Sequence, residues 1–203
     1  MGLTLLSAPL GEPLTLTEVK SHLRVDHTAD DALIAIYLRA AREYIDGPGG
    51  FLGRALVRQS WRLSLDGFPT DEIRIPLPPL SSVDAIRYDD TSGDEQLVNS
   101  QNFWVDKASE PGWIVRVDGV DWPTTLDGVN TVRVDFTAGY APGTNSPIDY
   151  GENIPFNIKA AMLLMIGNMY ENREDNVVGV ISTRLSNGAE YLLRRHKIDL
   201  SMA

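Results

Sequence analysis

The chain of 203 residues contains no cysteine. Disulfide scaffolds and cysteine-ligated metal sites are therefore excluded, and synthesis in a reducing cytoplasm is expected. Histidine is also scarce, with three residues and no H-E-x-x-H pair. The G-x-S-x-G elbow of many hydrolases and the G-x-x-x-x-G-K-[ST] phosphate loop are absent as well. We therefore expect neither enzyme activity nor a cofactor.

Long hydrophobic runs are missing too. The longest uninterrupted apolar run, residues 160–166, is far shorter than the roughly 20 residues of a membrane span. Residues 1–6 carry no basic side chain, so no signal peptide is expected. The sequence thus predicts a soluble chain without a membrane partner.

Positive charge is in the minority, with 18 Lys and Arg against 28 Asp and Glu and a net charge of −10. A protein that grips DNA by its phosphates needs a basic face, so this class is disfavoured. An acidic protein can still lie beside DNA where its task is to let DNA pass without adhering. The length fits one domain, or a small core that carries a large insertion.

Helix signals begin near the start of the chain. Thr15 and Glu18 form a capping box, which predicts a short helix ending near Arg24. A second helix is expected from residues 30–31 to residue 45, where the glycine-rich turn 47–50 stops it.

The second predicted helix has two apolar faces. One face follows helical spacing and should pack inward, and its residues are Ile34, Tyr37, Leu38, Ala41, Tyr44 and Ile45. Leu33, Ile36 and Ala40 form a second stripe beside it. A helix that is apolar on two faces needs two neighbours, so we expect the second stripe to pack against another copy of the chain.

Helix signals return near the end of the chain. Pro155 suits a first helical turn, and residues 158–170 are apolar almost all round, which predicts a central helix. We expect three methionines of this helix to join the packing between copies: Met162, Met165 and Met169. A last helix over residues 185–196 carries a basic cluster at its end, as a candidate partner contact, formed by Arg194, Arg195, His196 and Lys197.

The middle of the chain has the two-residue alternation of β-strands, clearest over residues 57–65. Further strands are expected at 73–75 (beside prolines, hence at a sheet edge), 82–88 (with a bulge), 96–98, 103–105, 113–117 and 131–136. The predicted fold class is α+β. A small helical bundle from residues 1–54 and 153–203 carries a β-rich meander or sandwich insert at 55–152.

The sequence gives only weak signals for a catalytic, metal-binding or carbohydrate-binding site. The adjacent pairs Asp89–Asp90 and Asp30–Asp31 point to different sides of a strand or helix, so they suit acid–base catalysis poorly. Asp26, Asp30 and Asp31 lack the spacing of a calcium loop, so no metal site is expected. Trp61, Trp104, Trp113 and Trp122 would suit a carbohydrate-binding platform, although aromatic residues of strands more often form core.

Nine segments, taken together and in this order, resemble the head–tail connector (adaptor) proteins of tailed phages. The likeness is to the type with a β-rich insert that gene transfer agents also carry. These segments are residues 14–26, 30–34, 40–45, 53–57, 59–61, 75–83, 137–140, 154–164 and 170–174. The likeness extends over roughly residues 14 to 174.

The resemblance implies a structural subunit of the virion neck. Such proteins form a ring, usually of twelve copies, below the portal; they bind the portal on one side and a stopper or tail protein on the other. The ring lines the exit channel, and DNA passes without specific binding. Their C-terminal part docks on the portal, so Arg194, Arg195, His196 and Lys197 are the expected portal contacts, and residues 176–190 are a candidate for ordering on binding. A stopper or tail-completion protein and a β-rich carbohydrate-binding module remain alternatives.

Overall fold

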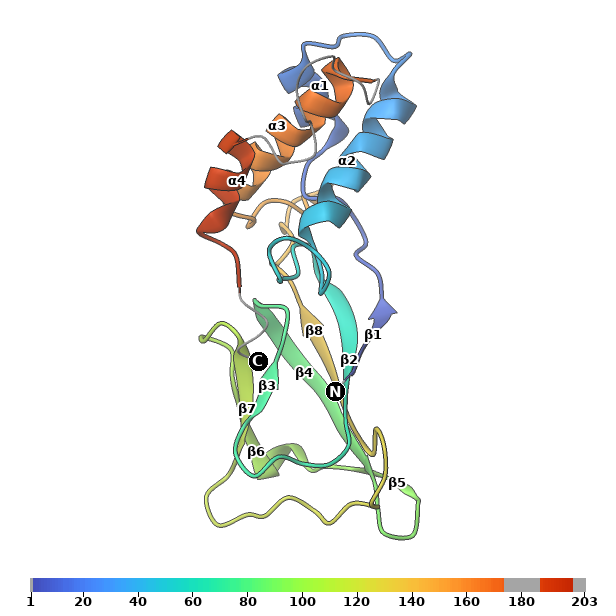
Figure 1. Cartoon of the computed structure of the whole chain (residues 1–203), viewed down its shortest axis with the longest axis vertical. Coiled ribbons are helices and arrows are strands. Elements are labelled where there is room, and N and C mark those ends of the chain that lie inside the picture. Colours follow the sequence, from blue (N-terminus) through green and yellow to red (C-terminus); the bar gives the residue numbers. More distant parts are fainter. Residues whose placement is uncertain (1, 174–186, 199–203) are drawn as a thin grey trace.

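The computed structural model describes residues 2–173 and 187–198. Its helices gather at one end of an elongated molecule and its strands at the other (Figure 1). The predicted α+β class is therefore confirmed. Within the described ranges, no helix combines the length and the apolar character that crossing a membrane requires.

Four α-helices lie in the described part, at α1 (Leu16–Leu23), α2 (Asp31–Ile45), α3 (Phe156–Glu171) and α4 (Asn187–Arg194). The predicted capping box starts α1: the Thr15 hydroxyl oxygen accepts from the Glu18 amide at 3.1 Å, and a Glu18 carboxylate oxygen accepts from the Thr15 amide at 2.7 Å. After α2, Gly47 has a φ of +80°, a conformation that glycine adopts without strain.

The helix α3 lies at the centre of the helical part and packs against α1, α2 and α4. Its buried residues are Ile158, Ala161, Met162 and Ile166. The helix α2 contributes Ile34, Leu38, Ala41 and Ile45 to the same hydrophobic cluster. Each large apolar side chain buried in this way stabilises the fold by about 1.5–3 kcal/mol.

The strands form two antiparallel sheets. The larger sheet has the order β1 (Gly2–Ser7), β2 (Gln59–Leu65), β8 (Val132–Ala138), β4 (Leu80–Asp89), β5 (Glu95–Leu97). The smaller sheet has the order β3 (Ile73–Ile75), β7 (Gly112–Arg116), β6 (Phe103–Asp106), with a short 3-10 turn η1 (Ser100–Asn102) before β6. As predicted, β3 lies at an edge, and the register of β4 shifts against β8, twice rather than once.

The strand β1 is a feature that the sequence analysis missed. Residues 2–7 pair with β2 at the edge of the larger sheet, with Leu3 opposite Leu63, although we expected residues 1–54 to belong to the helical part. Most side chains of β1 are exposed. Neither face of the strand is therefore required to be apolar, and its sequence shows no regular polar–apolar alternation. The division into helical core and β insert stays a prediction, while the structure shows one hydrophobic cluster in each part.

A buried arginine joins the two parts. Arg54 is 3% exposed, and its guanidinium donates to the His196 carbonyl oxygen (2.7 Å), the Tyr140 hydroxyl (2.9 Å) and both Glu110 carboxylate oxygens (3.2 and 2.7 Å). These acceptors come from the segment after α4, the segment after β8 and the loop between β6 and β7. Nearby, the Ile198 amide donates to the Leu52 carbonyl at 2.8 Å.

We expect Arg54→Ala to lower the free energy of unfolding by about 2–3 kcal/mol. Breaking a fully buried ion pair costs roughly 3–5 kcal/mol, and the loss is smaller here because the Glu110 side chain is 40% exposed and can be rehydrated. Urea unfolding measures the change, and hydrogen exchange should rise at residues 195–198. The control is Arg58→Ala, an exposed arginine of the same segment; equal effects of the two substitutions would contradict the junction role.

Candidate functional site

The carboxylate pairs have structural partners. Arg133 donates two hydrogen bonds to Asp89, and these lower the pKa of that carboxyl group. The Tyr170 hydroxyl donates to Asp30 and lowers its pKa as well. Both carboxylates are therefore engaged in ion pairs and hydrogen bonds that fix the fold. Within residues 2–173 and 187–198, no group of three or more His, Asp or Glu side chains is placed to hold a metal ion.

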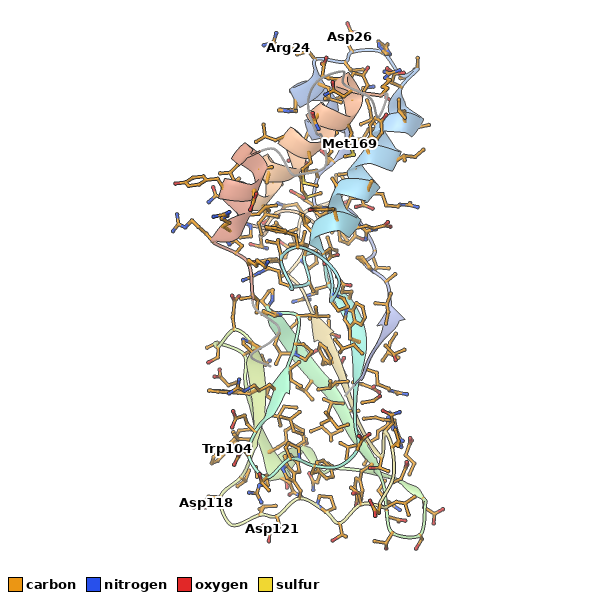
Figure 2. The ribbon with its side chains drawn as sticks, in the orientation of Figure 1. Arg24, Asp26, Trp104, Asp118, Asp121 and Met169 are labelled. Atoms are coloured by element: carbon orange, nitrogen blue, oxygen red, sulfur yellow. The ribbon has the colours of Figure 1, made fainter. Side chains whose placement is uncertain are left out.

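The four tryptophans do not share one surface. Trp61 is 7% exposed in the core of the larger sheet, Trp122 stacks on Phe68 with ring centroids 4.7 Å apart, and the Trp113 indole donates to Asp106 at 2.6 Å. Trp104 is 59% exposed and points outward from β6 (Figure 2). Three of the four rings thus have internal contacts, which is the arrangement of core aromatics.

The basic cluster at the end of α4 is divided between inward and outward contacts. His196 is held by Arg54 through its carbonyl, and the Lys197 ammonium lies 4.9 Å from the centroid of the Phe51 ring. Arg194 pairs with Glu190 one turn earlier at 2.9 Å, and its side chain is 71% exposed. Arg195 is exposed. Arg194, Arg195 and Lys197 are exposed and can face a partner, whereas His196 is half-buried. Most of the segment 176–190 lies outside the described residues.

The second apolar stripe predicted on α2 lies on the outer side of this helix, and part of it is exposed. Ile36 is 63% exposed, Ala40 is exposed and Leu33 is half-buried. Ile36 and Ala40, together with Ala35, Arg39 and Glu43, form the outward side of α2, and their side chains leave a shallow hollow of about 330 Å³ between them. We call these five residues the α2 ridge.

The methionine prediction needs a correction at Met162. Its side chain is fully buried in the helical cluster, because it lies on the same face of α3 as Ile158 and Ile166, and a neighbouring copy cannot reach it. Met165 and Met169 are half-buried against the same cluster, and Met169 lies between α3 and α2 in Figure 2.

A groove between α1 and α3 was missed by the sequence analysis. It has a volume of about 680 Å³ and is lined by Leu14, Thr17, Glu18, Ser21, His22, Phe156, Lys159, Ala160 and Leu163. Phe156, at its rim, is 83% exposed. The signal available in the sequence is spacing: Phe156, Ala160 and Leu163 recur at helical intervals on one side of α3. We call this feature the α1–α3 groove.

A third hollow, of about 490 Å³, is formed by residues 70–72 and 115–121 of the β part. Four of its residues are acidic: Asp71, Glu72, Asp118 and Asp121. Its arginine, Arg116, pairs with Asp121 at 3.1 Å, and Asp118 and Asp121 extend from the loop after β7 (Figure 2). The hollow therefore has an excess of negative charge, which disfavours phosphate groups there.

Burial lowers the pKa of His196, with the charges of Arg54 and Arg195 acting in the same direction and Glu110 opposing them. A lowered pKa means that the folded arrangement of residues 195–198 favours the neutral imidazole ring. The stability that the neutral ring adds to the fold is therefore present above the usual histidine pKa of 6.5 and is lost as pH falls through the lowered pKa.

We expect an NMR titration to give His196 a pKa below 6.5, with the resonance assigned by its loss in His196→Gln. Hydrogen exchange at residues 195–198, corrected for its intrinsic pH dependence, should rise as pH is lowered from 6.5 through that pKa, because the charged ring is poorly solvated beside Arg54. Exchange in α3 of the same sample serves as the internal control. The same rise in His196→Gln would show that another group is responsible.

The sequence was compared with protein-family models and with curated proteins. Residues 13–98 match the Phage gp6-like head-tail connector protein family. A search of curated proteins gave no match.

Solved structures match almost the whole chain. One is a chain in the neck of an empty gene transfer agent (GTA) particle computed with C6 symmetry, with 27% identity and a TM-score of 0.74. Others come from the virion of a native GTA particle (26%, TM-score 0.75) and the neck of a native GTA particle computed with C12 symmetry (26%, TM-score 0.72). Each match covers 98% of this chain and 96% of the other. The predicted resemblance is thereby confirmed: residues 13–98 are similar to head–tail connector proteins, and the fold of the chain is similar to that of chains in the neck of gene transfer agent particles.

Proposed function

We propose that the chain is a head–tail connector, or adaptor, subunit that forms a ring in the neck of a tailed phage or a phage-like particle. One observation carries this function: the fold matches, over 98% of the chain, a chain in the neck of a GTA particle. Necks computed with C6 and C12 symmetry support assembly into a ring. The chain is thus a component of the virion neck.

The proposal extends to a ring of twelve copies below the portal that joins it to a stopper or tail protein. Net charge supports a passive role toward DNA in the channel. Each chain carries −10, so twelve copies carry about −120 before counterions bind. Like charge disfavours adsorption of phosphates, and the acidic hollow of the β part adds to this. DNA would therefore slide past without specific binding.

The exposed arginines at the end of α4 are the proposed portal contact. Arg195 is exposed and Arg194 has its side chain 71% exposed. His196 and Lys197 support this contact, because the hydrogen bond from Arg54 to the His196 carbonyl oxygen and the contact of the Lys197 ammonium with the Phe51 ring hold the segment in place. Contacts between copies are proposed to involve Ile36 and Ala40, together with the half-buried Leu33, Met165 and Met169.

Purified particles test the function directly. A tagged copy of this chain should co-purify with particles at about twelve copies for each neck, as C12 symmetry implies, and imaging should locate the tag at the head–tail junction. Quantitative mass spectrometry against the portal gives the copy number. Absence from particles, or a location elsewhere in the tail, would show that the proposed function is wrong.

We expect Arg195→Glu to weaken binding to purified portal rings by about tenfold at low salt, and less at high salt, because a rim charge acts mainly through long-range attraction. Binding of each variant can be measured by surface plasmon resonance on immobilised portal rings. Arg58→Glu makes the same charge change at an exposed site of the β part and should bind as the unaltered chain does. Equal weakening by both variants would remove Arg195 from the portal contact.

A further inference from the structure

We propose that copies of this chain pack head to tail, with the α2 ridge of one copy seated in the α1–α3 groove of the next. This inference rests on the ring assembly proposed above and names its contact faces. A ring that closes by rotation joins two different patches of each subunit, so that every copy offers one patch to each neighbour. The helical part carries two exposed patches that meet this requirement.

The two patches lie on opposite sides of the helical part. Ile34, Leu38, Ala41 and Ile45 of α2 face inward, so the α2 ridge points away from the bundle. The helices α1, α2 and α3 each contact the other two. The solvent-facing groove between α1 and α3 therefore opens away from α2, as a lateral contact on both sides of a subunit requires.

Each patch combines small residues with one projecting apolar side chain. Ala35 and Ala40 of the ridge are small and flank the projecting Ile36, which is 63% exposed. In the groove, Ala160 leaves space on α3, while Phe156 projects at the rim with 83% of its surface exposed. Ile36 can thus enter the groove over Ala160, while Phe156 covers an alanine of the ridge. Helices that present small residues in this way approach each other closely.

The charges of the two patches also match. Arg39 and Glu43 are one turn apart on the ridge, so both lie on the face that carries Ile36. In the groove, a Glu18 carboxylate oxygen lies 3.2 Å from the Lys159 ammonium. Glu43 also lies 3.7 Å from Arg42 of its own helix. In the proposed contact Arg39 faces Glu18 and Glu43 faces Lys159, so that each charge meets one of opposite sign. The α2 ridge of a second copy therefore has the charges that the α1–α3 groove requires of its partner.

Engineered thiols test the contact without interference because the chain contains no cysteine. Ile36→Cys and Ala160→Cys proteins, each alone, should form no disulfide-linked dimer under mild oxidation. Their equimolar mixture should give one dimer, and the double variant a ladder of multimers. The mixture is oxidised at about 1 mM, where a contact with a Kd near 1 mM is well populated. Particles that carry the double variant are oxidised in parallel, since their ring is already assembled.

Val129→Cys is the matched control, because Val129 is 79% exposed but lies in the β part; paired with Ile36→Cys it should give no defined dimer. Strong dimers of Ile36→Cys alone would indicate a two-fold contact and overturn the proposal. Particles that contain the ring but give no ladder would overturn it as well, while leaving the connector function intact. A chain absent from particles would instead contradict the function.

Discussion

The guanidinium of Arg54 is the interaction on which the arrangement of the molecule depends. Helices pack on helices and strands on strands, so loops and chain ends carry the junction between the two parts. A buried charge is costly unless its donors are matched, and Arg54 meets this demand with acceptors from three separate segments. Its hydrogen bonds therefore hold the helical part, the smaller sheet and the chain after α4 in one orientation.

Local patterns predicted most of the regular structure. The capping box at Thr15 and Glu18 formed with both hydrogen bonds because its partners are three residues apart. The inner face of α2 followed the 3.6-residue period, and β2 the two-residue period, because each element is covered by the core on one side. These periods are read from neighbouring residues, so they need no knowledge of the tertiary fold.

The features that escaped prediction depend on distant contacts. The strand β1 is defined by pairing with β2, more than fifty residues away, and its exposed side chains leave no periodic trace. Arg54 stands among buried apolar residues, which signals a paired charge, but its partners lie 56, 86 and 142 residues further along the chain. The burial of Met162 was missed for the same reason: a helix that is apolar all round does not reveal which side a neighbour covers.

Both hydrophobic clusters are closed within one chain, so a subunit can fold before it meets its neighbours. Ile36 and Phe156 are exposed apolar residues of the helical part, and a contact built on these two side chains is weak between two free copies. Ring closure changes this balance, because each copy in a closed ring is held by two contacts, and once one has formed the other forms at high effective concentration. Weak lateral faces on a self-sufficient fold therefore allow a stable ring at the neck while limiting association of free subunits.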